Sequence, residues 1–153
     1  MTGLQDDPAS LRFVAGVDRQ AGALAWMEHE SDLKFWIVTS RRTQRWVLPK
    51  GGIDPGMTPH EAAAQEAFEE AGLIGDISAY GVGSYRIPKI RPPLIWTVEV
   101  SVYPMRVETV HDDWLESDQR VRRLVTVDEA AALIVEPEIV RLLRRAVPRL
   151  PAG

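Results

Sequence analysis

The 153-residue chain contains no cysteine, which excludes disulfides, zinc–thiolate centres and cysteine nucleophiles and fits a reducing compartment. It also lacks an excess of positive charge: the formal net charge is -4, so no overall basic field attracts it to nucleic acid or to an anionic membrane. No apolar run approaches the roughly 18 residues of a membrane span. An anionic substrate must therefore be met by a local group of cations or by a metal ion.

The composition indicates one globular domain. Hydrophobic residues make up 45% and charged residues 26% of the chain, a balance typical of folded proteins of this size. We expect residues 1–10 to be a mobile leader and residues 11–153 to be a single domain. The beginning of the sequence lacks the basic and apolar regions of a signal peptide, so the predicted location is the cytoplasm. The sequence leaves the oligomeric state open.

Patterns of apolar, charged and turn-forming residues predict an α/β fold, in which helices flank a mixed β-sheet. The stretch 86–93 is rich in proline and cations and is expected to be a loop, and 104–119 is expected to be a loop or an irregular strand. Strands are expected at 22–27, 35–39, 46–48, 77–85, 94–103 and 121–125, and helices at 59–71, from 126 to about 133 and from about 137 to 146.

The helix at 59–71 has the clearest boundaries. Thr58 and Glu61 form a Thr-x-x-Glu capping box, and Pro59 occupies the first helical position. Gly72 follows the last helical residue, where a left-handed conformation usually ends a helix. These signals predict both ends of the helix from local sequence alone.

Three glutamates of this helix share one face. Glu66, Glu69 and Glu70 stand at positions i, i+3 and i+4, where each like-charge pair destabilises a helix by about 0.2 to 0.5 kcal/mol. They also lie in the C-terminal half, where the helix dipole disfavours anions. A bound cation would offset this repulsion, and carboxylate oxygens suit Mg²⁺ or Mn²⁺ better than zinc. The alternative is that the glutamates face solvent.

The preceding segment, Pro49 to Gly56, is a glycine-rich turn whose backbone can approach a ligand closely. Taken together, residues 51–73 resemble the Nudix box. Met57 replaces the first glutamate of that pattern and Gln65 replaces its arginine. The resemblance extends from about residue 20 to about residue 146 and implies the Nudix alpha/beta/alpha sandwich. The matching residues are Gly51, Glu66, Ala67, Glu69, Glu70, Gly72 and Leu73.

The resemblance implies a metal site that holds Mg²⁺ or Mn²⁺. Its ligands would be Glu66, Glu69 and Glu70 together with the backbone carbonyl of Gly51, and the three glutamates would be the catalytic residues. Glu66 is also a candidate general base. The simultaneous loss of the box's glutamate and arginine leaves neither partner unpaired, which favours a compensated pair of substitutions.

Two groups of cations can meet substrate phosphates. The first lies in residues 41–50, which contain no acid, and the second comprises Arg86, Lys89 and Arg91. The alternative is that these side chains are merely solvated. The run from Thr39 to Gly52 resembles the Nudix branch that hydrolyses diphosphoinositol and diadenosine polyphosphates. The predicted substrate-binding residues are Ser40, Arg41, Lys50, Gly51, Gly52 and Arg122, of which the resemblance implies Ser40, Arg41 and Arg122 as phosphate contacts.

The sequence thus predicts a Nudix pyrophosphohydrolase that cuts a phosphoanhydride in a small phosphorylated substrate. Diadenosine polyphosphates and diphosphoinositol polyphosphates are the favoured substrates, and neither a membrane nor nucleic acid is an expected partner. Met57 and Gln65 motivate the alternative, a catalytically weak Nudix-fold module that binds a nucleotide or phosphorylated ligand. The physiological substrate and the number of metal ions stay open.

Overall fold

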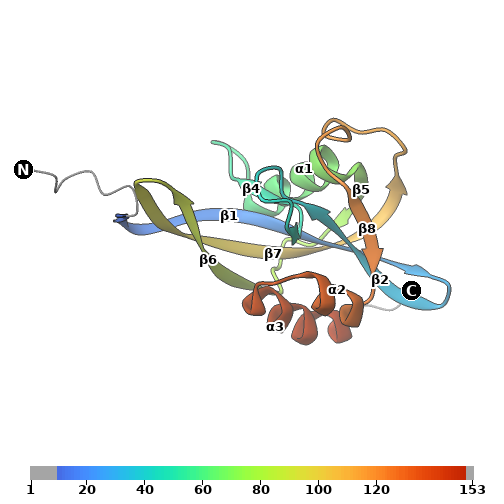
Figure 1. Cartoon of the computed structure of the whole chain (residues 1–153). Coiled ribbons are helices and arrows are strands. Elements are labelled where there is room, and N and C mark those ends of the chain that lie inside the picture. The colour runs from blue at the N-terminus through green and yellow to red at the C-terminus, as the bar shows by residue number, and fades with distance from the viewer. Residues whose placement is uncertain (1–9, 151–153) are drawn as a thin grey trace, which may run out of the picture.

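The computed structural model describes residues 10–150, in which helices cover both faces of one β-sheet (Figure 1). Helix α1 (Pro59–Ala71) lies on one face, and α2 (Val127–Leu133) and α3 (Pro137–Ala146) lie on the other. A short 3₁₀ helix, η1 (Val147–Arg149), follows α3. The predicted α/β sandwich is confirmed. Of the expected leader, residues 1–9 lie outside the described part of the chain, and within that part no helix has the length and apolar character to cross a membrane.

The sheet is mixed, as expected. Strand β1 runs parallel to β7, and the other pairs are antiparallel. The main order is β3-β2-β1-β7-β5, with β4 beside β1, β6 beside β7 and β8 beside β2. The strands are β1 (Arg12–His29), β2 (Asp32–Thr39), β3 (Trp46–Val47), β4 (Lys50–Gly52), β5 (Leu73–Ile77), β6 (Gly83–Arg91), β7 (Leu94–Val110) and β8 (Arg122–Val125).

Strand β1 contributes to two separate cores because successive side chains point to opposite faces of a sheet. Leu24 and Trp26 belong to the core beneath α2 and α3. The core beneath α1 is built largely from alanines, whose small side chains let the helix lie close to the sheet. These are Ala21, Ala23 and Ala25 of β1 and Ala62, Ala63, Ala67 and Ala71 of α1. This close packing holds α1 beside β4.

The structure corrects the expected boundaries after α1. Residues 86–91, predicted as a loop, belong to β6, which forms a hairpin with β7. Pro88 is tolerated there because β6 pairs with β7 alone among the described strands, so one of its edges needs no backbone donor. The expected strand 77–85 instead spans the gap between β5 and β6. Strand β7 continues to Val110 because its last residues pair with β5, and the irregular segment begins at His111.

Candidate active site

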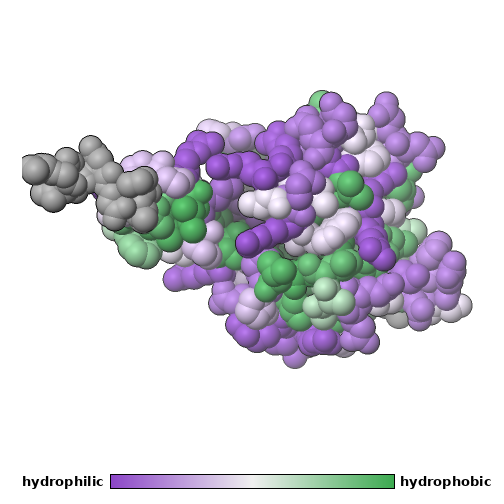
Figure 2. Space-filling model, in the orientation of Figure 1, coloured by the Kyte–Doolittle hydropathy of each residue, from purple (hydrophilic) through white to green (hydrophobic). Residues whose placement is uncertain are grey.

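A cleft of about 630 Å³ opens where α1, β4, β6 and the loop after β2 meet. Hydrophilic residues gather over the part of the molecule where α1 and β4 lie, next to an apolar band (Figure 2). No aromatic side chain lines the cleft within residues 10–150. Its charged lining consists of the cations Arg41, Arg42, Arg45, Lys50, Lys89 and Arg120 and the acids Glu66, Glu70 and Glu136.

The N-terminal end of α1 is formed by the predicted local contacts. The backbone N–H of Glu61 donates to the Thr58 hydroxyl over 3.3 Å, and the backbone N–H of Thr58 donates to the Glu61 carboxylate over 2.9 Å. Both halves of the capping box are therefore present. They fix the direction in which the chain leaves the turn at 51–57.

The C-terminal end of α1 is held by a distant segment, residues 111–122, which we call the capping segment. It donates to four carbonyl oxygens that have no donor within the helix. The Trp114 indole N–H binds the carbonyl of Glu70 at 2.8 Å, and Arg122 binds that of Ala71 at 2.7 Å. The backbone N–H groups of Glu116 and His111 bind the carbonyls of Glu69 and Gly72, at 3.1 and 2.9 Å.

Two of the three predicted glutamates come together in the cleft. Glu66 and Glu70 share a hydrogen bond, and Glu70 also accepts one from the backbone N–H of Lys50 at 3.3 Å. Burial raises the pKa of both carboxyl groups, that of Glu70 to about 8, despite the opposing charge of Arg120. Glu69 is placed differently: its carboxylate accepts a hydrogen bond from Gln65 at 2.7 Å and is not part of the cleft lining.

The glycine-rich turn lies directly against this pair. A Cβ atom on Gly51 would overlap the carboxylate of Glu66, so only glycine fits there. Gly52, by contrast, is exposed, and a Cβ on it would have no close neighbour. The structure therefore brings Gly51 to the predicted site and leaves Gly52 outside the cleft lining.

The residues present fit a hard divalent ion. Within residues 10–150, no three acidic or histidine side chains already surround one point. Glu66 and Glu70 nevertheless form a close carboxylate pair beside the backbone of Gly51, an all-oxygen donor set that such ions prefer. A cation would also relieve the repulsion between the two carboxylates. Glu69 would have to leave Gln65 to join them.

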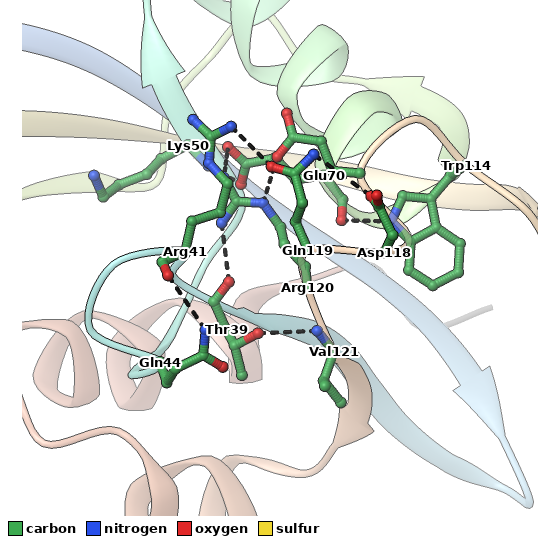
Figure 3. Close-up of polar contacts among 11 residues, drawn as sticks. Thr39, Arg41, Gln44, Lys50, Glu70, Trp114, Asp118, Gln119, Arg120 and Val121 are labelled. Carbon is green, nitrogen blue, oxygen red and sulfur yellow. Dashed lines mark hydrogen bonds and ion pairs between the residues drawn. The ribbon is translucent and has the colours of Figure 1, made fainter.

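Arg120 is the cation of the cleft that the sequence analysis missed. Its side chain is only 8% exposed, and each of its nitrogens has a partner (Figure 3). The guanidinium meets Glu70 at 3.3 Å and Glu116 at 2.6 Å, and it donates to the carbonyl of Thr39 at 2.9 Å. The i, i+4 spacing of Glu116 and Arg120 is the one sequence signal of this arrangement. Glu116 lies in the stretch 104–119 that we expected to be a loop or an irregular strand, and Arg120 follows directly after it.

Arg122, which we predicted to contact phosphate, lies at the end of α1 and not in the cleft lining. Its guanidinium stacks over the ring of Trp114, 4.0 Å from the centroid, and lies 5.3 Å from that of Trp36. It also donates to Ala71, as described above. Its position therefore suits capping of the helix.

The other predicted phosphate contacts line the cleft. Ser40 bonds to Thr43 at 2.5 Å and accepts from the backbone N–H of Arg45 at 3.1 Å, so its hydroxyl holds the loop after β2. Arg41 is exposed and reaches Gln119 at 3.1 Å (Figure 3). Lys50 donates to Gln20, and burial together with the charge of Lys89 lowers its pKa.

The second predicted cation group is split. Lys89 lines the cleft, whereas Arg86 pairs with Glu99 on β7 at 3.0 Å. Arg91 is not part of the lining. The structure therefore adds one residue of this group to the cations contributed by residues 41–50.

Comparisons with known proteins assign this chain to a family. The family model of the NUDIX domain matches residues 18–147. The chain belongs to the Nudix family. Diphosphoinositol polyphosphate phosphohydrolase 3-beta of Bos taurus is 28% identical to it over 121 residues, 78% of this chain and 70% of the relative. Diphosphoinositol polyphosphate phosphohydrolase 2 of Rattus norvegicus is 28% identical over 122 residues, 78% of this chain and 64% of the relative, slightly less than two thirds of its length.

Solved structures agree on the Nudix fold. A C. elegans Ap4A hydrolase has a TM-score of 0.65 at 20% identity, over 89% of this chain and 100% of its own. The NUDIX domain of Shewanella oneidensis NrtR, complexed with ADP ribose, has a TM-score of 0.66 at 12% identity, over 90% and 91%. At these identities the likeness concerns the fold. The family match and the phosphohydrolase names of the relatives support a pyrophosphohydrolase.

Two positions of this Nudix box depart from the family pattern. Gln65 stands where the arginine is usual, and it orients Glu69 through the 2.7 Å hydrogen bond. Met57 is half-buried in the turn before α1, where its backbone N–H donates to the carbonyl of Asp54. The chain therefore retains an orienting contact for one box glutamate without using a charged side chain.

Proposed function

We propose that this Nudix protein hydrolyses a phosphoanhydride bond in a small polyphosphorylated substrate with the help of Mg²⁺ or Mn²⁺. The observation that carries the proposal is one cleft in which half-buried Glu66 and buried Glu70 share the lining with six cations. Such a cleft separates the tasks of the reaction. The carboxylates bind the ion and accept the proton of the attacking water, and the cations bind the phosphates.

The ion would be held by Glu66, Glu69, Glu70 and the carbonyl of Gly51, and when bound it would neutralise phosphate charge and acidify a water molecule. Glu66 accepts the proton of the attacking water at a carboxylate oxygen, because it lines the cleft in which the substrate binds. Arg120 keeps Glu70 in the cleft.

The cations bind and orient the phosphates. Ser40 and Arg41 on the loop after β2, with Lys50 and the backbone of Gly51, form the phosphate-binding wall. Gly52, which we also predicted to bind substrate, lies outside this lining. Arg120 takes the position in this proposal that we predicted for Arg122. Arginine supplies paired donors that match phosphate oxygens. Diadenosine polyphosphates and diphosphoinositol polyphosphates are the favoured substrates, which the names of the relatives and of the structural neighbour support.

A phosphate-release screen tests this function. Wild-type protein is incubated with Mg²⁺ or Mn²⁺ and diadenosine polyphosphates, diphosphoinositol phosphates, ADP-ribose or nucleoside triphosphates. We expect turnover that requires the ion and falls about 100-fold or more in Glu70→Gln, since misplaced catalytic groups cost rates of this order. Glu108→Gln, an exposed acid on β7, is the matched control. Absence of turnover with every substrate and both ions would refute the proposal.

The second candidate is a module that binds a phosphorylated ligand without cutting it. The hydrogen bond between Gln65 and Glu69 favours it, because it holds one box glutamate away from the other two. The NUDIX domain of NrtR complexed with ADP ribose is a structural neighbour. Calorimetric binding of a substrate from the screen, without release of phosphate, would support this candidate. A cytoplasmic location and the absence of a nucleic-acid partner stay predictions from the sequence.

A further inference from the structure

Glu136 lies in the cleft without a partner that explains its position. It is the N-cap residue of α3, a position at which shorter side chains such as that of Asp accept a hydrogen bond from a backbone N–H of the first turn. Its side chain makes no such bond. It lines the cleft instead, together with β6 residues such as Ile87 and Lys89. Its side chain therefore belongs to the cleft wall and not to the cap of the helix.

The carboxylate of Glu136 is also incompletely bonded. Its Oε1 atom is buried and has no hydrogen-bond partner among the described residues. A buried acceptor without a donor costs free energy, and a charged one costs more. The cleft contains six cations, yet no ion pair of the described residues includes Glu136. Glu136 is therefore an unsatisfied acceptor on the wall of a ligand cleft.

A second unsatisfied polar group belongs to the same region. The hydroxyl of Tyr85 on β6 is buried, in a residue only 3% exposed, and has no hydrogen-bond partner among the described residues. Burial raises its pKa, and the negative charges of Glu136 and Glu70 add to that effect. The tyrosine hydroxyl therefore stays protonated and lies within electrostatic range of both acids.

We propose that Glu136 is a specificity-determining residue, which accepts a hydrogen bond from a hydroxyl or amine on the non-phosphate part of the substrate. This rests on the proposed function, and it divides the cleft by charge. Arg41, Lys50 and Arg120 attract phosphate, whereas Glu136 repels phosphate and attracts a hydrogen-bond donor. A substrate is oriented with its phosphate chain toward the cations and its donor group toward the beginning of α3.

This assignment selects between the two favoured substrate classes. A fully phosphorylated inositol ring would present another anion to Glu136, whereas a nucleoside presents sugar hydroxyls and, in adenine, an exocyclic amine. Glu136 therefore favours a dinucleoside polyphosphate. A site that hydrogen-bonds a substrate donor discriminates strongly against an analogue without it, because its own buried group is then left unpaired.

The test compares Glu136→Ala and Glu136→Gln with wild type on diadenosine tetraphosphate and on inorganic tripolyphosphate, which has phosphates but no hydroxyl or amine. We expect Glu136→Ala to raise KM for diadenosine tetraphosphate about 10-fold or more, with kcat nearly unchanged, from the loss of a hydrogen bond to a charged group. KM for tripolyphosphate should stay constant or fall, because a repelling charge is removed. Glu136→Gln, which keeps an acceptor oxygen, should restore part of the affinity.

Equal changes in KM for both probes, or no change for either, would overturn the assignment. Glu138→Gln, an exposed acid in the same helical turn, is the control for effects on α3. A diinosine tetraphosphate, which lacks the exocyclic amine, tests one of the two donor sources: an unchanged Glu136 effect excludes that amine as the donor. If wild type cuts none of these compounds, the proposed function fails, and the same comparison is made by calorimetric binding. Equal binding losses for both probes would then overturn the role of Glu136.

Discussion

The two ends of α1 are stabilised in different ways. At the N-terminal end, Thr58 and Glu61 are three residues apart and cap each other. At the C-terminal end, the carbonyls of Glu70 and Ala71 receive donors from Trp114 and Arg122, far along the chain. The first end depends on local sequence, and the second depends on tertiary structure. Because Glu69 and Glu70 lie at the second end, the position of the candidate catalytic groups is a property of the whole fold.

Among these variants, Arg120→Ala should have the largest effect on stability, because Arg120 holds the C-terminal end of α1. It removes the buried partner of Glu70 and Glu116 and a donor to Thr39. Loss of one member of a buried ion pair typically costs about 3 to 5 kcal/mol. Urea unfolding should detect this loss, together with a large fall in turnover. Arg123→Ala, an exposed arginine on β8, serves as control, and a loss below about 1 kcal/mol would show that the pair contributes little.

Trp114→Phe isolates one hydrogen bond of the capping segment. The substitution keeps an aromatic face for Arg122 but removes the N–H that donates to the carbonyl of Glu70. We expect a loss of about 2 kcal/mol, since a part-buried carbonyl is left unpaired, and a lower kcat because the last turn of α1 loosens. Unfolding free energy and kcat should fall together. Normal kcat in a destabilised variant would separate the cap from catalysis.

Thr58→Ala should have a smaller effect, confined to stability. Removal of an N-cap hydroxyl typically costs about 1 kcal/mol. Thr58 lies at the opposite end of α1 from Glu70, so kcat measured below the unfolding temperature should not change. Thr58→Ser, which keeps the hydroxyl, is the matched control. A fall in kcat as large as that of Trp114→Phe would remove the distinction between the two ends.

The two ends also differ in the sign of a dependence of stability on pH. Hydrogen bonds from the backbone and side chain of Thr58 lower the pKa of Glu61, so its contribution is present above its ordinary pKa of 4.5 and is lost in acid. The raised pKa of Glu70 works the other way: metal-free protein should lose stability as pH rises from about 4.5 to about 8.

Unfolding of metal-free wild type and Glu70→Gln, measured across this range of pH, tests the second sign. The variant should show a flatter curve, because it no longer releases the proton that the folded protein binds more tightly than the unfolded chain. Thr58→Ala should instead change the acidic limb of the curve. Identical slopes in wild type and Glu70→Gln would contradict the pKa of Glu70.

The same contrast explains how far the sequence predicts the structure. Features encoded by neighbouring residues were predicted well: the capping box of α1 is present, and α1 has the expected bounds. Strand β6 was missed because Pro88 and its cations are typical of a loop, and only its pairing with β7 makes it a strand. Local sequence cannot report that pairing.

The residues of the candidate site also fall into two groups, those that local sequence predicts and those that only the fold brings into the cleft. The spacing of Glu66 and Glu70 in one helix predicted that they meet, and Gly51 lies against them as expected. Arg120 and Glu136 reach the cleft from segments without a recognisable motif, so their roles follow from the fold alone. The resemblance implied Arg122 as a phosphate contact, and the structure shows that Arg122 caps α1 while Arg120, two residues earlier, lines the cleft.

The capping segment also limits whether the Nudix box, residues 51–73, can be transferred to another protein. A graft of residues 51–73 into another Nudix scaffold would carry the capping box of α1 but none of the donors to its last carbonyls. Gly72 adds a steric condition, because a Cβ there would meet the Trp114 side chain at 2.9 Å. Recombination that separates 51–73 from 111–122 should therefore yield poorly ordered chimeras. In this chain, residues 51–73 and the capping segment must therefore be transferred together.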